Sequence, residues 1–131
     1  MIVIDSSALI AILVGEPEKQ AFEAVIAGAE RCVISAVNAH ETATVLRLRH
    51  GAAAVERFWQ LLTESEIDIA PFDELQVRAA AVAFDKYGKG INPRARLNLS
   101  DCAAYALAKT MNAPLLFKGH DFTQTDLQSC L

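Results

Sequence analysis

The stretch LNLSDCAAYALA, residues 97–108, opens with polar side chains and continues as a run of small and apolar ones. Ser100 is a typical helix N-cap, which places Asp101 in the first turn, where the helix dipole favours a negative charge. At helical spacing Asp101 shares a face with Ala104 and Ala108. Because such small residues let another segment approach, Asp101 points toward a packed face and needs a partner, either a capped amide or a cation. A simple first-turn charge explains Asp101 equally well on this evidence alone.

Composition predicts one compact domain over residues 1–131. The chain has 131 residues, of which 53% are hydrophobic, enough for a substantial core. The first basic residue is Lys19 and the longest early apolar run is 8–14, which is too short to span a membrane. Three cysteines without Cys-x-x-Cys spacing argue against a disulfide framework and a thiolate zinc site. We therefore expect a cytoplasmic protein that makes no membrane contact.

The charge distribution is more informative than the total. The formal net charge is −4, which is unusual for a nucleic-acid-binding protein. Residues 86–96, however, include Lys89, Arg94 and Arg96 and contain no acid, and the next acidic residue is Asp101. This stretch is either a local phosphate-binding loop or a solvated loop whose charges favour solubility.

Short β-type runs alternate with helical periodicity along the whole chain. The predicted strands are 1–4, 31–35, 67–70 and 115–117. The predicted helices are 8–14, 17–28, 37–50, 52–63, a helix capped by Asp73 that ends near Tyr87, and the helix that begins at Ser100. Such alternation predicts an α/β fold of three layers (αβα), with a central parallel sheet and helices on both faces.

Four acids occupy positions from which they can meet. Asp5 and Asp121 each follow a predicted strand, and in a parallel sheet all strand carboxyl ends lie at one edge. Glu41 lies on an apolar stripe of its predicted helix, where an unpaired carboxylate would be costly to bury. Together with Asp101, these residues predict a cluster of carboxylates at the carboxyl edge of the sheet.

Such a cluster favours a divalent cation. Two carboxylates about 4 Å apart repel by roughly 4 kcal/mol at an effective dielectric constant near 20. All-oxygen ligands select Mg²⁺, with Mn²⁺ as a substitute, rather than zinc. A site of this kind suits hydrolysis of phosphodiester bonds by a metal-activated water, and the basic stretch would contact the flanking phosphates.

Five segments together resemble a known family. They are VIDSSAL (3–9), ETA (41–43), YGKG (87–90), LNLSDCAAYALAK (97–109) and PLLFKGHDFTQTD (114–126). In type and order they resemble PIN-domain ribonucleases, and among these the VapC-type toxins of bacterial toxin–antitoxin pairs. The last two segments together are highly specific, whereas the first is weak by itself.

The resemblance implies an Mg²⁺-dependent endoribonuclease that forms a homodimer and is inhibited by a VapB-like antitoxin. It also implies that Asp5, Glu41, Asp101 and Asp121 are the catalytic, metal-binding acids and that RNA is the substrate. Two departures stand out: Ser6 replaces a frequent threonine, and Asn92 stands where many relatives have a histidine before the proline. Asp126 is a further acid near Asp121, and its membership of the site stays open.

Two other interpretations fit less well. A phosphoacceptor receiver domain needs an aspartate after the third strand, where this chain has Ala70 and Pro71. A catalytically silent binding module would be expected to lose at least one of the four acids, and none is lost. The sequence therefore favours the ribonuclease, without indicating which RNA is cut.

Overall fold

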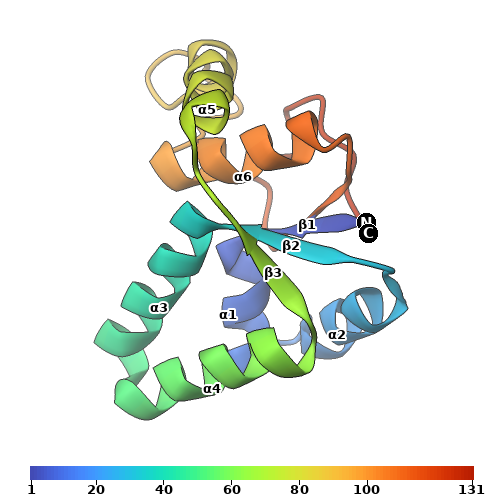
Figure 1. Cartoon of the computed structure of the whole chain (residues 1–131). Helices are drawn as coiled ribbons and strands as arrows, with labels where there is room; N and C mark the ends of the chain where they lie inside the picture. The colour runs from blue at the N-terminus through green and yellow to red at the C-terminus, as the bar shows by residue number, and fades with distance from the viewer.

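A four-stranded parallel sheet forms the middle of the protein (Figure 1). The computed structural model describes all 131 residues. The strands are β1 (Ile2–Ile4), β2 (Cys32–Ser35), β3 (Ile67–Ala70) and β4 (Leu115–Leu116), in the order β3-β2-β1-β4. In the register of the sheet, Val3 of β1 pairs with Val33 on one side and Leu115 on the other. The carboxyl ends of all four strands therefore point the same way, as predicted.

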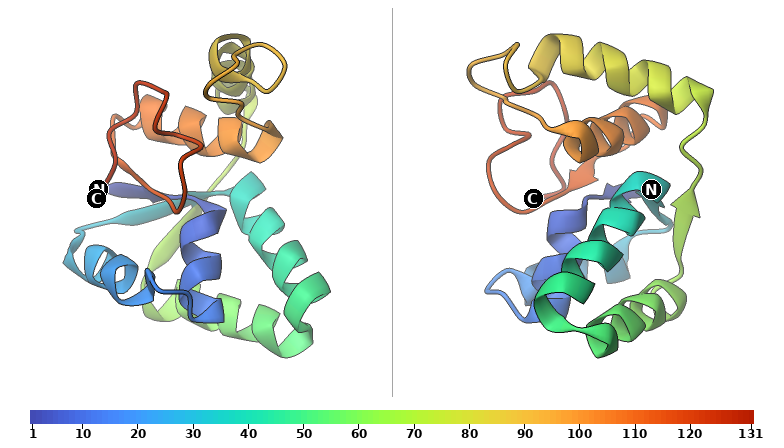
Figure 2. Two further views of the ribbon diagram at one scale, coloured as in Figure 1. Left: turned by 180° about the vertical axis from the view of Figure 1, so that it is seen from behind. Right: turned by 90° about the vertical axis from the view of Figure 1, so that its left-hand side faces the viewer.

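Helices cover both faces of the sheet (Figure 2). Four lie on one face: α1 (Ser6–Val14), α2 (Lys19–Gly28), α3 (Ala36–His50) and α4 (Ala52–Glu64). Two lie on the other face: α5 (Glu74–Tyr87) and α6 (Leu99–Thr110). The predicted three-layer αβα architecture is thus confirmed. None of the helices combines the length and the hydrophobicity that crossing a bilayer requires.

Successive side chains of the strands point to opposite faces of the sheet and pack into two separate hydrophobic cores. Ile4 and Ile34 belong to the core under α1 to α4, whereas Val3 and Val33 belong to the core under α6. Residues 101–108 of α6 are all buried, because this helix is enclosed by the sheet, α5 and the C-terminal segment. The alanine-rich sequence of α6 permits this close approach on several sides.

Two helix starts differ from the prediction. Helix α6 is capped by Asn98 rather than Ser100, since the Asn98 side chain accepts a hydrogen bond from the Asp101 amide while the Asp101 carboxylate accepts one from the Asn98 amide. This reciprocal capping box is available only to Asn98. Helix α1 begins at Ser6 rather than at the predicted residue 8, and it is capped by Asp5, whose carboxylate accepts from the Ser7 amide.

Helices α3 and α5 leave apolar side chains exposed to solvent. The buried face of α3 is formed by Asn38, Ala39, Thr42 and Leu46, so Glu41 lies at its border and Leu48 is 81% exposed. In α5 only Gln76 and Ala83 are buried. The other large apolar residues of α5 are exposed and flank this buried strip, Leu75 and Val82 on one side and Val77 and Phe84 on the opposite side.

Candidate active site

Asp5 lies at the carboxyl end of β1 and is buried. Its Oδ2 accepts hydrogen bonds from the Ser7 amide (3.1 Å) and the Ser7 hydroxyl (2.6 Å). Its other oxygen receives no hydrogen bond from the protein. Ser7 therefore fixes one carboxylate oxygen and leaves the second available to a ligand.

Glu41 and Asp101 are brought together by the start of α6. Asp101 is buried, and its Oδ2 accepts from the Asn98 amide at 3.0 Å. Glu41 is partly buried on α3, and its Oε2 accepts from the Ser100 hydroxyl at 2.6 Å. As in Asp5, one oxygen of each carboxylate is held and the other is free of protein hydrogen bonds.

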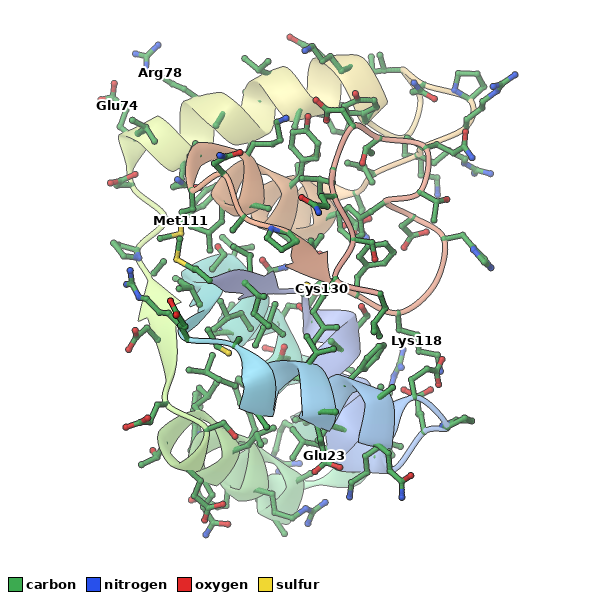
Figure 3. All side chains as sticks on the ribbon, turned by 90° about the vertical axis from the view of Figure 1, so that its right-hand side faces the viewer. Glu23, Glu74, Arg78, Met111, Lys118 and Cys130 are labelled. Carbon is green, nitrogen blue, oxygen red and sulfur yellow. The ribbon has the colours of Figure 1, made fainter.

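Asp121 lies in the loop that follows β4, and its side chain is exposed. This loop is anchored to α1 and the segment after it through Lys118 (Figure 3). The Lys118 amide donates to Ser7 Oγ (2.9 Å), and its Nζ is 2.5 Å from Glu16 Oε2. Ser7 thus bonds both Asp5 and the loop that carries Asp121.

The negative charges of the four acids are not balanced by a basic side chain in contact with them. Burial, reinforced by the charges of Glu41 and Asp121, raises the pKa of Asp5 to about 6 against the opposing hydrogen bonds from Ser7. Burial also raises the pKa of Asp101 to about 7, with the charges of the other three acids adding to the effect. None of the four forms an ion pair with a lysine or an arginine. The predicted acids are therefore electrostatic neighbours that lack a protein cation.

The carboxylates do not form a ready-made coordination sphere. No group of three or more His, Cys, Asp or Glu side chains is arranged so that it could hold a metal ion as it stands. The donor set nevertheless suits a hard divalent cation, because all ligands are oxygens and the free oxygens of three anchored carboxylates are unpaired. Ligation would require these side chains to turn toward a common point.

A cavity of about 390 Å³ joins two of the acids to the basic loop. Lys89, Arg94 and Arg96 line it together with Asp101 and Asp121. The structure therefore places the three predicted basic residues beside the carboxylates, in a cavity open to solvent and large enough for parts of a nucleotide chain.

Asn92 shapes this loop from within. Its Oδ1 accepts from the Arg94 amide (2.8 Å) and the Ala95 amide (3.0 Å), while its Nδ2 donates to the Lys86 carbonyl (3.0 Å). The side chain of Asn92, which departs from the family pattern, therefore stabilises the backbone of the basic loop.

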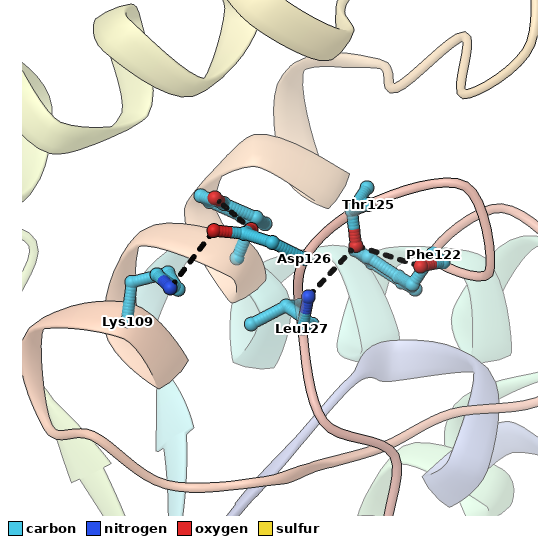
Figure 4. A network of polar contacts seen from close by, with 6 residues as sticks. Lys109, Phe122, Thr125, Asp126 and Leu127 are labelled. Atoms are coloured by element: carbon cyan, nitrogen blue, oxygen red, sulfur yellow. Dashed lines mark hydrogen bonds and ion pairs between the residues drawn. The ribbon is translucent and has the colours of Figure 1, made fainter.

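Asp126 is engaged elsewhere (Figure 4). One of its carboxylate oxygens accepts from the Tyr105 hydroxyl and the other from Lys109 Nζ at 3.0 Å. The hydrogen bond from Tyr105 is the main reason why the pKa of Asp126 is lowered. Both oxygens are occupied, so Asp126 fastens the C-terminal segment to α6 and does not join the four acids.

Sequence reasoning missed several residues at this edge of the sheet. His120 lines the cavity beside Asp121. Asn38 is fully buried in α3 and donates through Nδ2 to the Ser100 carbonyl at 3.0 Å. The position of His120 next to Asp121 was a usable signal, whereas nothing local marks Asn38, because its partner lies 62 residues away.

Comparison with known proteins identifies the family of the chain. The PIN domain family matches residues 2–127. Ribonuclease VapC30 of Mycobacterium tuberculosis is 40% identical over 125 residues, which cover 95% of each chain. The crystal structure of M. tuberculosis VapC20, described as a Sarcin-Ricin loop cleaving toxin, has a TM-score of 0.79 at 15% identity and covers 97% of this chain and 96% of its own.

A toxin–antitoxin complex from Klebsiella pneumoniae contains a chain with a TM-score of 0.73 at 18% identity, covering 96% of this chain and 93% of its own. At such identities the two solved structures support the fold alone. The family match and the 40% identity along nearly the full length carry the assignment. The chain described here therefore belongs to the PIN domain family and, within it, to the VapC ribonucleases.

Proposed function

We propose that this chain is an Mg²⁺-dependent endoribonuclease, with Mn²⁺ as a substitute ion, and the toxin of a VapBC-like toxin–antitoxin pair. The observation that carries the proposal is a set of four neighbouring carboxylates without a protein cation, two of which, Asp101 and Asp121, line a cavity together with three basic side chains. Residues 1–131 form one PIN-like unit in this proposal, because the sheet pairs β1 with β4 near the other end of the chain.

The reaction is hydrolysis of an RNA phosphodiester bond. Asp5, Glu41, Asp101 and Asp121 would hold the metal, which when bound lowers the pKa of an attacking water and stabilises the leaving oxygen. The chain's own contribution is to orient these carboxylates through hydrogen bonds such as that from Ser7 to Asp5.

The basic side chains of the same cavity would hold the RNA. Lys89, Arg94 and Arg96 would bind phosphates that flank the scissile bond, since cationic side chains neutralise the backbone of a single strand without reading its sequence. His120, which lines the same cavity, offers a ring that can contact a nucleotide. Cleavage therefore depends on acids for the chemistry and on the loop for substrate retention.

Cleavage mapping on total RNA tests the activity. Purified, partner-free protein should cut RNA at defined positions in Mg²⁺ and should not cut in chelator. Asp101→Asn, purified in the same way, controls for contaminating nucleases. Equal cleavage by the parent and by this variant, or cleavage by the parent in chelator, would contradict the proposal.

We further infer that a VapB-like antitoxin inhibits the chain by inserting an arginine among the four acids. The guanidinium is a planar fork of donors that matches paired carboxylates and removes their repulsion. The Klebsiella neighbour was solved as a toxin–antitoxin complex, which supports a protein partner of this kind. Such a partner would occupy the acids in place of a metal.

Co-expression with a neighbouring small reading frame tests the inhibition. The complex should be stable and inactive on RNA, and activity should return when the partner is removed by denaturation and refolding. A complex that cuts RNA as fast as the free chain at saturating partner would contradict site occlusion.

A homodimer is proposed through exposed apolar side chains of α5. Leu75 (62% exposed) and Val82 (56% exposed) share one side of this helix, and a second copy would cover them. Light scattering should give a dimer mass for the parent and a monomer mass for Val82→Glu. A monomeric parent at micromolar concentration would contradict this assignment.

A further inference from the structure

Asn38 is a fully buried polar residue at the junction of α3 and α6. It lies one helical turn before Glu41, and its Nδ2 donates to the carbonyl of Ser100, the residue before Asp101 (3.0 Å). A single amide therefore connects the helix that carries Glu41 to the helix that carries Asp101.

The backbone of Asn38 extends this connection to the third acid. Its carbonyl accepts from the hydroxyl of Ser6, the residue that follows Asp5, at 3.1 Å. The same carbonyl accepts from Thr42 Oγ1 at 2.7 Å. Asn38 thus bonds to chain neighbours of both Asp5 and Asp101, although these elements are far apart in sequence.

Ser100 bonds to α3 through both its side chain and its backbone. Its hydroxyl donates to Glu41 Oε2 at 2.6 Å while its carbonyl accepts from Asn38. Helices α3 and α6 are therefore joined by two hydrogen bonds through one residue, and one of them ends on a carboxylate of the site.

Stability alone does not explain Asn38. Its Oδ1 is buried and has no hydrogen-bond partner, and an unpaired buried acceptor destabilises the folded state. The Ser100 carbonyl also lies inside α6, where the helix supplies its own donor four residues later. A leucine at position 38 would therefore fill the same space without leaving a polar group unpaired.

We propose that Asn38 is a positioning residue that acts through Ser100 to fix the Glu41 and Asp101 carboxylates relative to Asp5 for cation binding. This inference rests on the proposed metal-dependent function. Partners one step removed from metal ligands fix the direction of those ligands, and their loss costs about 10–100-fold in metal affinity or activity.

The test compares Asn38→Leu with Gln76→Leu. Gln76 is a matched control because it is also a buried amide, donates through Nε2 to Thr110 Oγ1 (2.8 Å) at the other end of α6, and has an unpaired buried Oε1. Asn38→Leu should lose about tenfold in Mn²⁺ affinity, measured by electron paramagnetic resonance, and in kcat at nearly unchanged KM. Gln76→Leu should change neither quantity.

Equal Mn²⁺ affinity and kcat in the parent and Asn38→Leu would overturn the inference, as would equal losses in Asn38→Leu and Gln76→Leu. If Asn38→Leu does not fold, Ser100→Ala and Ser100→Thr decide in its place. Ser100→Ala should reproduce the loss and Ser100→Thr, which keeps the hydroxyl, should restore affinity. Parent-like affinity in Ser100→Ala would overturn the inference.

Amide hydrogen exchange in chelator separates this inference from the proposed function. Asn38→Leu should speed exchange in the first turn of α6, at Asp101 and Cys102, whereas Gln76→Leu should not. A parent that neither binds Mn²⁺ nor cuts RNA would contradict the proposed function, while unchanged exchange in Asn38→Leu would contradict the positioning role itself.

Discussion

Carboxylates at the two ends of α6 experience opposite environments. At the amino end, Asp101 is buried among other acids, and burial with their charges raises its pKa to about 7. Near the carboxyl end, Asp126 is bonded to Tyr105 and Lys109, and the hydrogen bond from Tyr105 is the first cause of its lowered pKa. Helix α6 thus carries one carboxylate that has no protein cation, Asp101, and binds another from the C-terminal segment, Asp126, that is paired with Lys109.

The pairing of Asp126 with Lys109 shows that the fold can place a basic side chain beside a carboxylate where a structural bond is needed. At the carboxyl edge of the sheet it provides hydrogen bonds from Ser7, Asn98 and Ser100 but no lysine or arginine in contact. Carboxylates that are oriented yet unpaired retain their repulsion. This pattern is expected of a site whose positive charge comes from a bound ion or a partner.

The largest effect is expected from Asp101→Asn, which should reduce RNA cleavage about a thousandfold or more, because several kcal/mol of transition-state stabilisation would depend on the proposed metal. Asp126→Asn, the matched change at the other end of the contrast, should retain activity within about twofold. Initial rates with a defined RNA measure both. Full Mg²⁺-dependent activity in Asp101→Asn would contradict a catalytic role for Asp101 and, with it, the difference in role between Asp101 and Asp126.

Metal-free stability should depend on pH in a direction set by the raised pKa values. Asp5 and Asp101, with pKa values of about 6 and about 7, bind more protons in the folded state than in the unfolded state, where both have ordinary values near 3.8. The contribution of these two groups to the free energy of unfolding is therefore greatest below about pH 4 and is lost as the pH rises to about 7. In chelator, Tm should fall by about 5 °C or more over this range.

Asp101→Asn should flatten this pH dependence, because the amide does not ionise. Asp126 contributes with the opposite sign, since its lowered pKa stabilises the fold above its ordinary range and that contribution is lost on acidification. A parent whose Tm in chelator rises steadily from pH 4 to 7 would contradict the assignment of buried, unpaired acids.

Millimolar Mg²⁺ or Mn²⁺ should raise Tm at pH 7.5, because a ligand that binds only the folded state stabilises it by about 2.7 kcal/mol at a hundredfold excess over Kd. Thermal scans should show a smaller increase for Asp5→Asn and Glu41→Gln than for the parent. The increase should be unchanged in Asp126→Asn. An identical Tm of the parent in metal and in chelator would contradict the predicted metal site.

Replacing Lys89, Arg94 and Arg96 together with alanine should weaken RNA binding and lower the slope of log affinity against log salt by about 2, as three phosphate contacts on a single strand predict. Fluorescence anisotropy in chelator measures this binding. Stabilisation by metal should stay as in the parent. An unchanged salt slope would mean that these residues form a solvated loop.

The smallest effect is expected from Asp126→Asn on stability. The ion pair with Lys109 is about half exposed, and such pairs contribute less than about 1 kcal/mol. The Tyr105 hydroxyl keeps an acceptor in the amide oxygen. Denaturant unfolding should show a loss below about 1 kcal/mol, and a larger loss would show that Asp126 is more than a surface clamp.

The sequence by itself determined the order of strands and helices and the positions of Asp5 and Asp121 after strands. These features depend on hydrophobic periodicity and turn residues within about ten residues of each position. The basic loop was also visible, because Lys89, Arg94 and Arg96 lie close together in the chain and lead directly into Asp101.

Only the tertiary structure decided how the side chains meet. It selected Asn98 over Ser100 as the cap of α6, engaged Asp126 with Tyr105 and Lys109, and placed the buried Asn38 against Ser100. Each of the last two outcomes depends on how segments distant in sequence pack against α6 and how that helix is rotated about its axis. Bonds such as Ser100 to Glu41, 59 residues apart, follow from that packing geometry, which no local pattern of residues encodes.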